Sequence, residues 1–289
     1  MGGETILEGI SSKTIYKCPV CQLDLIMQKN QYICGRGHSF DISEKGYVNL
    51  LLANQKKTND PGDSKEMMES RKNFLNKEYY TRLSEGLNKI VAFHLNKTSR
   101  YILDVGCGEG YFISKLKNKL HMQENWTDIN YYGIDISKSA IIYALRRDKS
   151  NYFAIGSNFN LPIMDDSCDF VMRNFAPSDD KEIHRVLKTS GKLVVVTPGI
   201  EHLFELKEKL YEKARKHEVK GSLLNGFKLL EHQEIQYSIH LKEHEDIRNL
   251  ISMTPYYWNI TSDMRNKIDQ ITSLITTLDF NIDVYSKAM

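Results

Sequence analysis

The sequence has few of the residues and segments that mark unusual classes of protein. It contains only 6 Pro and 17 Gly in 289 residues, and 41% of its residues are hydrophobic, which excludes a disordered or fibrous chain. It has no apolar run near the roughly 20 residues that a transmembrane helix needs. Its N-terminus also lacks the basic and then apolar pattern of a signal peptide. These absences predict a folded, cytoplasmic protein with no membrane partner.

The chain also lacks an excess of charge of either sign. Its 39 Lys and Arg balance 37 Asp and Glu, so the net charge of +2 neither predicts nor excludes binding to nucleic acid. Cysteine is scarce, yet three of the 5 cysteines fall within the first 34 positions. Without an export signal, this clustering favours a metal site over disulfide bonds.

The clustered cysteines follow the spacing of a zinc site. Cys18 and Cys21 form a C-x2-C pair, and Cys34 and His38 form a C-x3-H pair. Zinc binds four such ligands in a tetrahedron, and each short spacing lets one tight turn supply two of them. Because protein fills all four positions, the pattern predicts a structural zinc ion. The alternative of free thiols beside a surface histidine would leave this small segment without a core.

The order of polar and apolar residues divides the chain into three parts. We expect an N-terminal zinc-binding module over residues 1–53, a linker and helical region over 54–100, and a larger domain over 101–289. The helical region shows one broken or two consecutive helices over 64–95. In the larger domain, strand-like and helix-like segments alternate, which predicts an α/β doubly wound, Rossmann-like sheet. Its expected strands are 101–105, 131–135, 152–155, 169–174 and 192–197, its helices 110–120, 138–147, 179–187 and 201–216, with a late antiparallel pair at 227–240 and 279–285.

A glycine-rich turn follows the first of these strands. Glycines alternate over residues 106–110, where they let the backbone approach a ligand and where the next helix offers free N–H groups. Asp135 ends the following strand, at the place where an acid accepts hydrogen bonds from ribose hydroxyls. Together they predict a nucleoside ligand. Glu109 inside the turn disfavours a pyrophosphate and suits a cationic sulfonium.

The turn and a later loop resemble those of class I methyltransferases that use S-adenosylmethionine. The run from Asp104 to Gly110 resembles their cofactor motif, and the segment from Ser157 to Ile163 resembles their adenine-side loop. The resemblance implies cofactor binding by Asp104, Gly106, Gly108, Glu109, Asp135, Asn158 and Leu161.

More particular segments resemble one family of these enzymes. The zinc pattern, the run Gly46-Tyr-Val-Asn-Leu-Leu51 and the run Asp60-Pro-Gly-Asp-Ser64 together resemble the bacterial RlmA family, the 23S ribosomal RNA (guanine-N1)-methyltransferases. The resemblance covers the chain from about Ile15 to the C-terminus. It implies zinc on the four ligands named above and S-adenosylmethionine near Tyr80, Gly108–Glu109 and His202.

The resemblance also implies an activity. The chain is expected to transfer a methyl group from S-adenosylmethionine to N1 of one guanine in a hairpin loop of 23S ribosomal RNA. A homodimer and resistance to tylosin-type macrolides are further expectations from the family. Two alternatives stay open: a methyltransferase for another RNA or a small molecule, and a zinc-ribbon RNA-binding factor without turnover.

The catalytic base and the RNA contacts are less clearly marked. Asp63 and Asp166 are candidates for the base by their placement in turns alone. Because residues 1–80 are not strongly basic, we expect RNA contacts from local groups. These groups are Arg36, Lys56–Lys57, Arg71–Lys72, Tyr32 and Tyr47.

Overall fold

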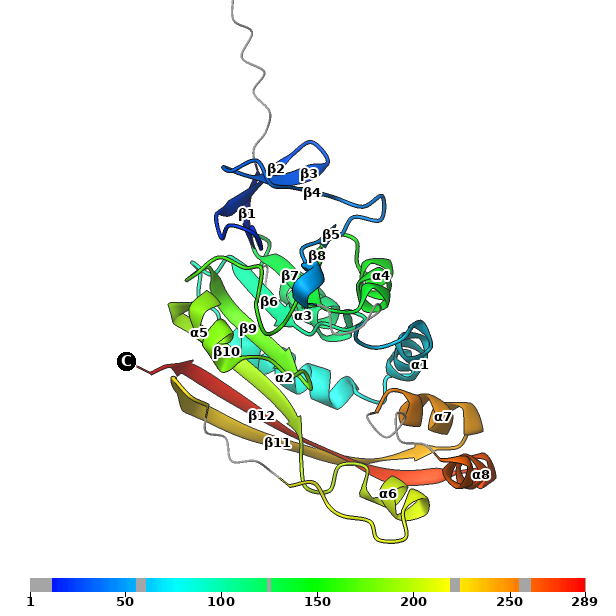
Figure 1. Ribbon diagram of the computed structural model, residues 1–289. Helices are drawn as coiled ribbons and strands as arrows, with labels where there is room; N and C mark the ends of the chain where they lie inside the picture. The colour runs from blue at the N-terminus through cyan, green and yellow to red at the C-terminus, as the bar shows by residue number, and fades with distance from the viewer. Residues whose placement is uncertain (1–11, 56–60, 124–125, 219–223, 255–260, 289) are drawn as a thin grey trace, which may run out of the picture.

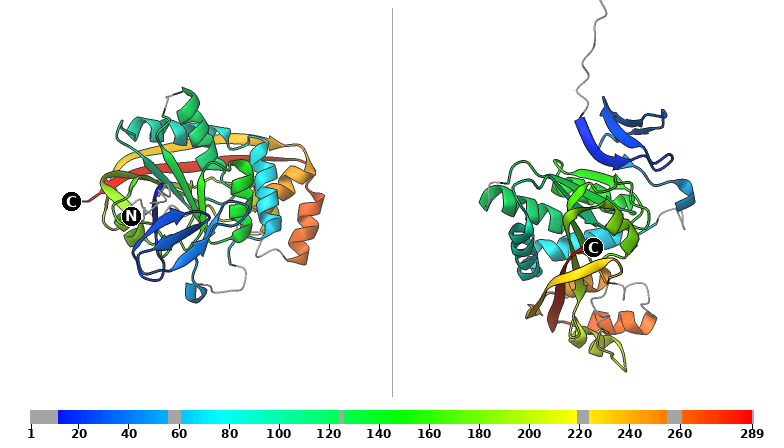
Figure 2. Two further views of the ribbon diagram at one scale, coloured as in Figure 1. Left: turned by 90° about the horizontal axis from the view of Figure 1, so that it is seen from above. Right: turned by 90° about the vertical axis from the view of Figure 1, so that its left-hand side faces the viewer.

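A computed structural model describes residues 12–55, 61–123, 126–218, 224–254 and 261–288. The first described residues form a small antiparallel sheet at one end of the molecule, whereas α6 and α8 lie at the other end (Figures 1 and 2). This sheet contains β1 (Ser12–Lys17), β2 (Asp24–Gln28), β3 (Gln31–Cys34) and β4 (Ser39–Asp41), in that order. The rest of the described chain is built around a larger sheet.

The larger sheet has eight strands in the order β11-β12-β10-β9-β6-β7-β8-β5. All its pairs are parallel except those that β12 makes with β10 and β11. The strands are β5 (Val48–Asn49), β6 (Tyr101–Val105), β7 (Asn130–Asp135), β8 (Tyr152–Ile155), β9 (Cys168–Asn174), β10 (Leu187–Pro198), β11 (Phe227–Leu241) and β12 (Leu274–Lys287). The predicted α/β doubly wound sheet and the predicted late antiparallel pair are therefore confirmed.

Most of the helices pack on one face of the large sheet. Alternate strand residues such as Ile102, Met172 and Val194 share a core with all helices except α5 and η1. The helices are η1 (Ala53–Gln55), α1 (Lys65–Asn76), α2 (Thr81–His94), α3 (Tyr111–Gln123), α4 (Lys138–Arg147), α5 (Asp180–Val186), α6 (Phe204–Leu210), α7 (His244–Ser252) and α8 (Ser262–Gln270). None of these described helices is both long and apolar enough to span a membrane.

The opposite face of the sheet is covered by α5 and by the N-terminal strands. Leu103, Val171 and Val195 point to this side because side chains alternate along a strand, and they share a core with Ile183 of α5 and Tyr16 of β1. On this face of the large sheet, the N-terminal strands take the place of some of the helices that cover the other face. The small sheet therefore shares its hydrophobic core with the large one.

The contact between the two sheets centres on Tyr16. Its ring is fully buried and meets the rings of Tyr32 and Tyr132 edge-on, with centroids 5.2 Å away in each case. The backbone of Tyr16 also bridges to Ile163, and β5 extends the large sheet beside β8. The N-terminal region is thus joined to the rest of the protein by both side chains and backbone pairing.

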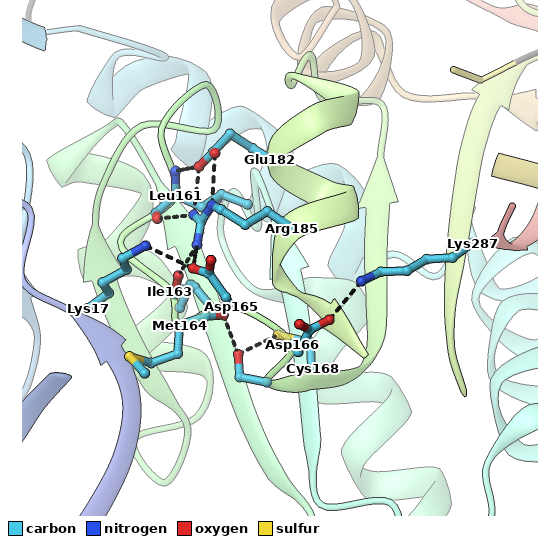
Figure 3. Close-up of polar contacts among 11 residues, drawn as sticks. Lys17, Leu161, Ile163, Met164, Asp165, Asp166, Cys168, Glu182, Arg185 and Lys287 are labelled. Carbon is cyan, nitrogen blue, oxygen red and sulfur yellow. Dashed lines mark hydrogen bonds and ion pairs between the residues drawn. The ribbon is translucent and has the colours of Figure 1, made fainter. Parts of the chain in front are cut away.

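A polar network reinforces this junction (Figure 3). Arg185 donates to carbonyl oxygens in loop 161–163 and pairs with Glu182 and Asp165, in each case at 2.7 or 2.8 Å. Lys17 of β1 pairs with the same Asp165 at 2.8 Å. Arg185 therefore holds the loop after β8 in place, and Lys17 ties the small sheet to that loop.

One predicted helix is much shorter than expected. The sequence predicts a helix over 201–216, but α6 spans only Phe204–Leu210. Leu206 and Leu210 are buried, whereas most side chains after Tyr211 are exposed. The helix ends where no further apolar side chain can pack on the sheet, since packing of an apolar face supplies most of the stability of a short helix.

Tyr16 gives a test of the junction. Its hydroxyl is buried without a hydrogen-bond partner among the described residues. We therefore expect Tyr16→Phe to raise the free energy of unfolding by about 1 kcal/mol, because it removes a buried polar group that makes no bond. Tyr16→Ala should lower it by about 3–5 kcal/mol through the cavity it leaves. Urea unfolding measures both values, and a loss of stability in Tyr16→Phe would show that the hydroxyl is bonded in solution.

Candidate functional site

The four predicted zinc ligands lie together at the end of the small sheet. Their ligand atoms all fall within 4.8 Å of one another. Sγ of Cys21 lies 3.6 Å from Sγ of Cys34, and Nδ1 of His38 lies 3.4 Å from Sγ of Cys34 and 3.7 Å from Sγ of Cys18. A tetrahedral zinc ion needs about 3.8 Å between sulfur ligands and about 3.5 Å between sulfur and nitrogen. The donor set and its spacing therefore fit zinc.

A cavity of about 660 Å³ opens at the carboxyl ends of the central strands. Its walls come from the glycine turn, the ends of β7, β9 and β10, and the segments around α1 and α7. This edge is where the chain order of the sheet reverses, between β6 and β9, and ligands of open α/β sheets bind at such a point. Its volume is that of a site for a small molecule or cofactor.

The glycine turn forms the floor of the cavity. Gly106, Gly108 and Gly110 have φ values of +71°, +55° and +78°, a backbone region that other residues rarely adopt. At Gly106 a Cβ atom would lie only 2.4 Å from the Cβ of Ala176. Glycine is therefore required here both for the backbone conformation and for the close approach of the neighbouring loop.

Asp135 lies at the end of β7, facing the glycine turn. Its Oδ2 accepts a hydrogen bond from the N–H of Gly108 at 2.9 Å, and its Oδ1 accepts one from the N–H of Ser137 at 2.8 Å. Burial raises the pKa of the carboxyl, and these two N–H donors oppose that rise. The carboxylate is thus fixed at the cavity wall, with free lone pairs for a ligand.

Asp104 and Glu109 add two more buried acids to the cavity. Burial raises the pKa of Asp104 to about 7, and the nearby carboxylate of Asp135 adds to the effect. Burial likewise raises the pKa of Glu109 to about 7, although Arg147 opposes it. Three acids in one cavity favour a cationic ligand, because a positive charge stabilises their ionised forms.

Glu109 shows where such a cation can bind. Its Oε2 pairs with Arg147 at 2.6 Å, while its Oε1 is buried without a partner among the described residues. An unmatched buried carboxylate oxygen is costly. The ammonium group of S-adenosylmethionine is a donor that fits this oxygen.

His202 and Tyr80 also line the cavity. Burial lowers the pKa of His202 to about 3, so the imidazole is neutral near pH 7. Its Nδ1 accepts a hydrogen bond from the backbone N–H of Asp279 at 3.3 Å, which leaves the proton on Nε2. The ring of Tyr80 packs edge-on against Phe74 and Phe280. The family resemblance implies that both residues bind the cofactor, and the structure places both at the cavity.

Two residues were predicted to lie beside the adenine, and only one of them lines the cavity. Asn158 lines the cavity, and its Oδ1 is buried without a partner among the described residues. Leu161 is absent from the cavity wall: its side chain is buried in the core beneath β1, and its N–H donates to Glu182 at 2.7 Å. Leu161 therefore positions the loop through packing.

The two candidates for a catalytic base lie in different places. Asp63 lines the cavity, where it pairs with Arg71 at 2.7 Å. Asp166 lies on the surface, where it pairs with Lys287 at 2.8 Å, and is not part of the cavity wall (Figure 3). Of the two, only Asp63 lies at the site.

Some of the residues predicted to contact RNA are buried or lie in the cavity wall. Tyr32 is buried against Tyr16, so it has no free face for stacking on a base. Arg71 lies in the cavity wall beside Gly108, where its charge acts on the cavity acids. Arg36 is exposed and Tyr47 is half-buried, whereas Lys56 and Lys57 lie outside the described residues.

The cavity also contains residues to which the sequence assigned no role. Tyr111, Phe112 and His217 line it, from the start of α3 and from the segment after α6. The position of Phe112 just after the glycine turn is a signal that could have identified it. His217 comes from a segment expected to be helical, so no local pattern marked it.

Comparison with known proteins identifies two regions of the chain. The family model described as "Methyltransferase domain" matches residues 96–246, and the model described as "RlmA, N-terminal", a zinc ribbon, matches residues 16–59. The first match covers more than half of the chain.

Individual relatives match over most of their length. A Streptomyces fradiae protein named 23S rRNA (guanine(748)-N(1))-methyltransferase is 27% identical over 86% of this chain and 87% of its own. YxjB of Bacillus subtilis, which carries a 23S rRNA (guanine-N1)-methyltransferase name as a provisional assignment, is 27% identical over 93% of this chain and 96% of its own. Among solved structures, the YcgJ protein of Bacillus subtilis superposes with a TM-score of 0.45 at 16% identity, covering 72% of this chain and all of that chain.

The cluster of four ligands predicts a bound zinc ion. It also predicts that the stability of residues 14–53 depends on that ion. We expect one zinc ion per chain by elemental analysis, and Cys21→Ser should lose it. Cys168→Ala is the matched control, because Cys168 is a buried cysteine of the large sheet and should leave the zinc content unchanged. Chelation should increase hydrogen exchange over residues 14–53 far more than in the large sheet, since metal supplies much of the stability of such a small module. Equal protection of residues 14–53 with and without metal would contradict this.

Because Asp135 lies at the cavity wall, we expect its replacement to lower the affinity for the cofactor. Asp135→Ala should weaken binding of S-adenosylmethionine by roughly 10- to 150-fold, since hydrogen bonds to a charged group contribute about 1.5–3 kcal/mol. Isothermal titration calorimetry measures the affinity, and a thermal melt checks the fold. Asp166→Ala is the control, because that carboxylate lies outside the cavity. Unchanged affinity in Asp135→Ala would place the ribose elsewhere.

Proposed function

Since the chain belongs to the methyltransferase-domain family, we propose that it transfers a methyl group from S-adenosylmethionine to N1 of one guanine in a hairpin loop of 23S ribosomal RNA. The match of residues 16–59 to the RlmA N-terminal zinc ribbon carries this proposal, because it joins a methyltransferase domain to the module of that family. Similarity along nearly the whole chain to relatives named for this reaction supports it. The resemblance to the RlmA family that the sequence predicted is confirmed.

The cavity residues divide into roles toward the cofactor. When bound, S-adenosylmethionine supplies an electrophilic methyl group on a positively charged sulfur. We propose that Asp135 binds its ribose, that Glu109 binds its ammonium group, and that Nε2–H of His202 donates to its carboxylate. The three buried acids support this assignment, since the ligand brings two positive charges into their cavity.

The remaining predicted cofactor residues shape the cavity around these groups. Gly106 and Gly108 allow the backbone to approach the ligand, and Tyr80 closes the wall from the start of α2. Asp104 contributes negative charge beneath the turn, and Asn158 offers Oδ1 to the adenine amino group.

The substrate base must leave its pairing partner before it can react. N1 of guanine lies on the Watson–Crick edge and carries a proton in the neutral base, so an unpaired or extruded base is needed. We propose that residues 1–53 bind the RNA hairpin, that 54–100 link this module to the core, and that 101–289 carry the transfer. The packing of Tyr16 and Lys17 on the large sheet supports a fixed placement of the module relative to the cavity.

Three finer features follow the family resemblance. We propose a cytoplasmic location, where ribosomal RNA is assembled, and a homodimer. We also propose that the methyl group contributes to resistance to tylosin-type macrolides. Growth of a deletion strain on tylosin, with and without the restored gene, tests the last of these.

Primer extension on protein-free 23S ribosomal RNA tests the activity. Incubation with the protein and S-adenosylmethionine should produce a new reverse-transcriptase stop one nucleotide before a single hairpin guanine, because a methyl group on N1 blocks pairing. Omission of the cofactor should abolish the stop.

Other outcomes of this experiment would favour one of the two alternative functions. Incorporation of tritiated methyl groups without a stop would indicate another atom or another substrate. Binding of the RNA with no incorporation into RNA or ribosomal precursors would indicate a binding factor without turnover. Either result would contradict the proposed reaction.

A further inference from the structure

The loop between β8 and β9, residues 156–167, lies between the cavity and the zinc-binding module. Near its start, Asn158 and Phe159 line the cavity. Near its end, the carbonyl of Pro162 accepts a hydrogen bond at 3.0 Å from the N–H of Lys17, the last residue of β1. A single short loop therefore contacts both the cavity and the strand that leads into the zinc ligands.

The end of β1 is joined both to the metal cluster and to this loop. Cys18, the first zinc ligand, directly follows Lys17 in the chain. Nζ of Lys17 pairs with Oδ1 of Asp165 at 2.8 Å. The backbone of β1 also bonds to the loop, because the N–H of Met164 donates to the carbonyl of Ile15 at 2.8 Å. Since one short strand carries both a zinc ligand and these bonds, release of the metal should loosen the loop.

Arg185 of α5 joins the end of the loop to its middle (Figure 3). Its Nη2 donates to the carbonyl of Leu161 at 2.8 Å, and its Nη1 donates to the carbonyl of Ile163 at 2.7 Å. Nη1 also pairs at 2.7 Å with Oδ1 of Asp165, the same oxygen that Lys17 contacts. Because one planar guanidinium makes all three bonds, the three loop residues keep fixed positions relative to one another. A displacement at Asp165 is therefore passed along the loop to Leu161.

The part of the loop at the cavity makes longer hydrogen bonds. The carbonyl of Asn158 accepts one from the N–H of Asp179 at 3.4 Å, and Nδ2 of Asn158 donates to the carbonyl of Pro177 at 3.2 Å. Phe159 is 59% exposed. These bonds are weaker than the bonds of 2.7 or 2.8 Å that Arg185 makes at the other end. The order of Asn158 therefore depends on the anchor that β1 and Arg185 provide.

We propose that this loop couples the zinc-binding module to the cofactor site, so that zinc in the module strengthens the binding of S-adenosylmethionine in the cavity. The coupling acts through Asn158, and it therefore rests on the proposed place of the adenine. Zinc holds β1, β1 and Arg185 hold the loop, and the loop presents Asn158 to the ligand. Coupling between two binding sites is reciprocal, so the cofactor strengthens the retention of zinc by the same factor.

Binding measurements on the full chain test this coupling without turnover. Calorimetry gives the affinity for S-adenosylhomocysteine, which lacks the reactive methyl group, with zinc bound and after a chelator has removed it. Removal of zinc should weaken binding roughly 5- to 150-fold, the usual range for coupled sites. In the reverse direction, saturating S-adenosylhomocysteine should raise the affinity for zinc by the same factor, as measured by competition with a chromogenic chelator. Equal affinities in the two metal states would overturn the proposal.

Asp165→Asn tests the path of the coupling, because it removes the pair with Lys17 and leaves the backbone bonds to β1. The Asp165 side chain is 57% exposed, so the variant should fold. With zinc bound, it should bind S-adenosylhomocysteine about 2- to 5-fold more weakly, as expected for one lost ion pair. The pair with Arg185 is lost in both metal states, so the ratio of the two affinities should fall. Asp165→Glu keeps the carboxylate and should restore the ratio.

Asp166→Asn is the matched control. Asp166 is the next residue of the same loop and is 66% exposed, but it pairs with Lys287 of β12 (Figure 3). Its replacement should leave both affinities unchanged. An equal effect of the two substitutions, or none for Asp165→Asn, would contradict the path through Lys17. If the metal-free protein loses the large sheet by circular dichroism, the zinc-bound variants decide the proposal.

Failure of the proposed function gives a different result. It would remove the reverse-transcriptase stop made by the wild-type protein, while the affinities for S-adenosylhomocysteine in the two metal states would still decide the coupling.

Discussion

The left-handed backbone of the glycine turn is the constraint on which the site depends. Three alternating glycines let the chain leave β6 and enter α3 while it touches three neighbours. N–H groups of the turn bond to the carbonyl of Ile134 at the end of β7, and Gly106 packs on Ala176 after β9. Gly110 would place a Cβ 3.0 Å from that of Ala144 in α4. A side chain at these positions would separate the elements that form the cavity.

The N-terminal module has two physical tasks in this structure. Zinc ligands close its loops, since so few residues bury little apolar surface alone. Its inner side, around Tyr16, then covers a face of the large sheet. The N-terminal strands therefore carry the cluster of zinc ligands and also form part of the core of the large sheet. Between the two parts, Lys17 and Arg185 both pair with the carboxylate of Asp165.

Local spacing predicted those parts of the site that depend on nearby residues. The zinc ligands were identified from two short pairs, and Asp135 was identified from its place at the end of the strand that follows the glycine turn, where parallel topology brings the two together. Leu161 and Tyr32 were misjudged, because their exposure depends on the packing of distant segments. Sequence alone could not reveal the contact of Lys17 with Asp165, since the two residues are 148 positions apart and meet only through the packing of β1. The end of α6 likewise depends on where the sheet stops offering apolar contacts.

The position of β12 has a consequence for how the chain folds during synthesis. This strand comprises residues 274–287 and lies between β10 and β11, both of which emerge from the ribosome earlier. Until it appears, the outer edge of β10 and its valines remain unpaired, a state that invites association with other strands. The zinc ligands, in contrast, have all emerged once His38 has left the exit tunnel. The large sheet can therefore be completed only after both neighbours of β12 have been synthesised.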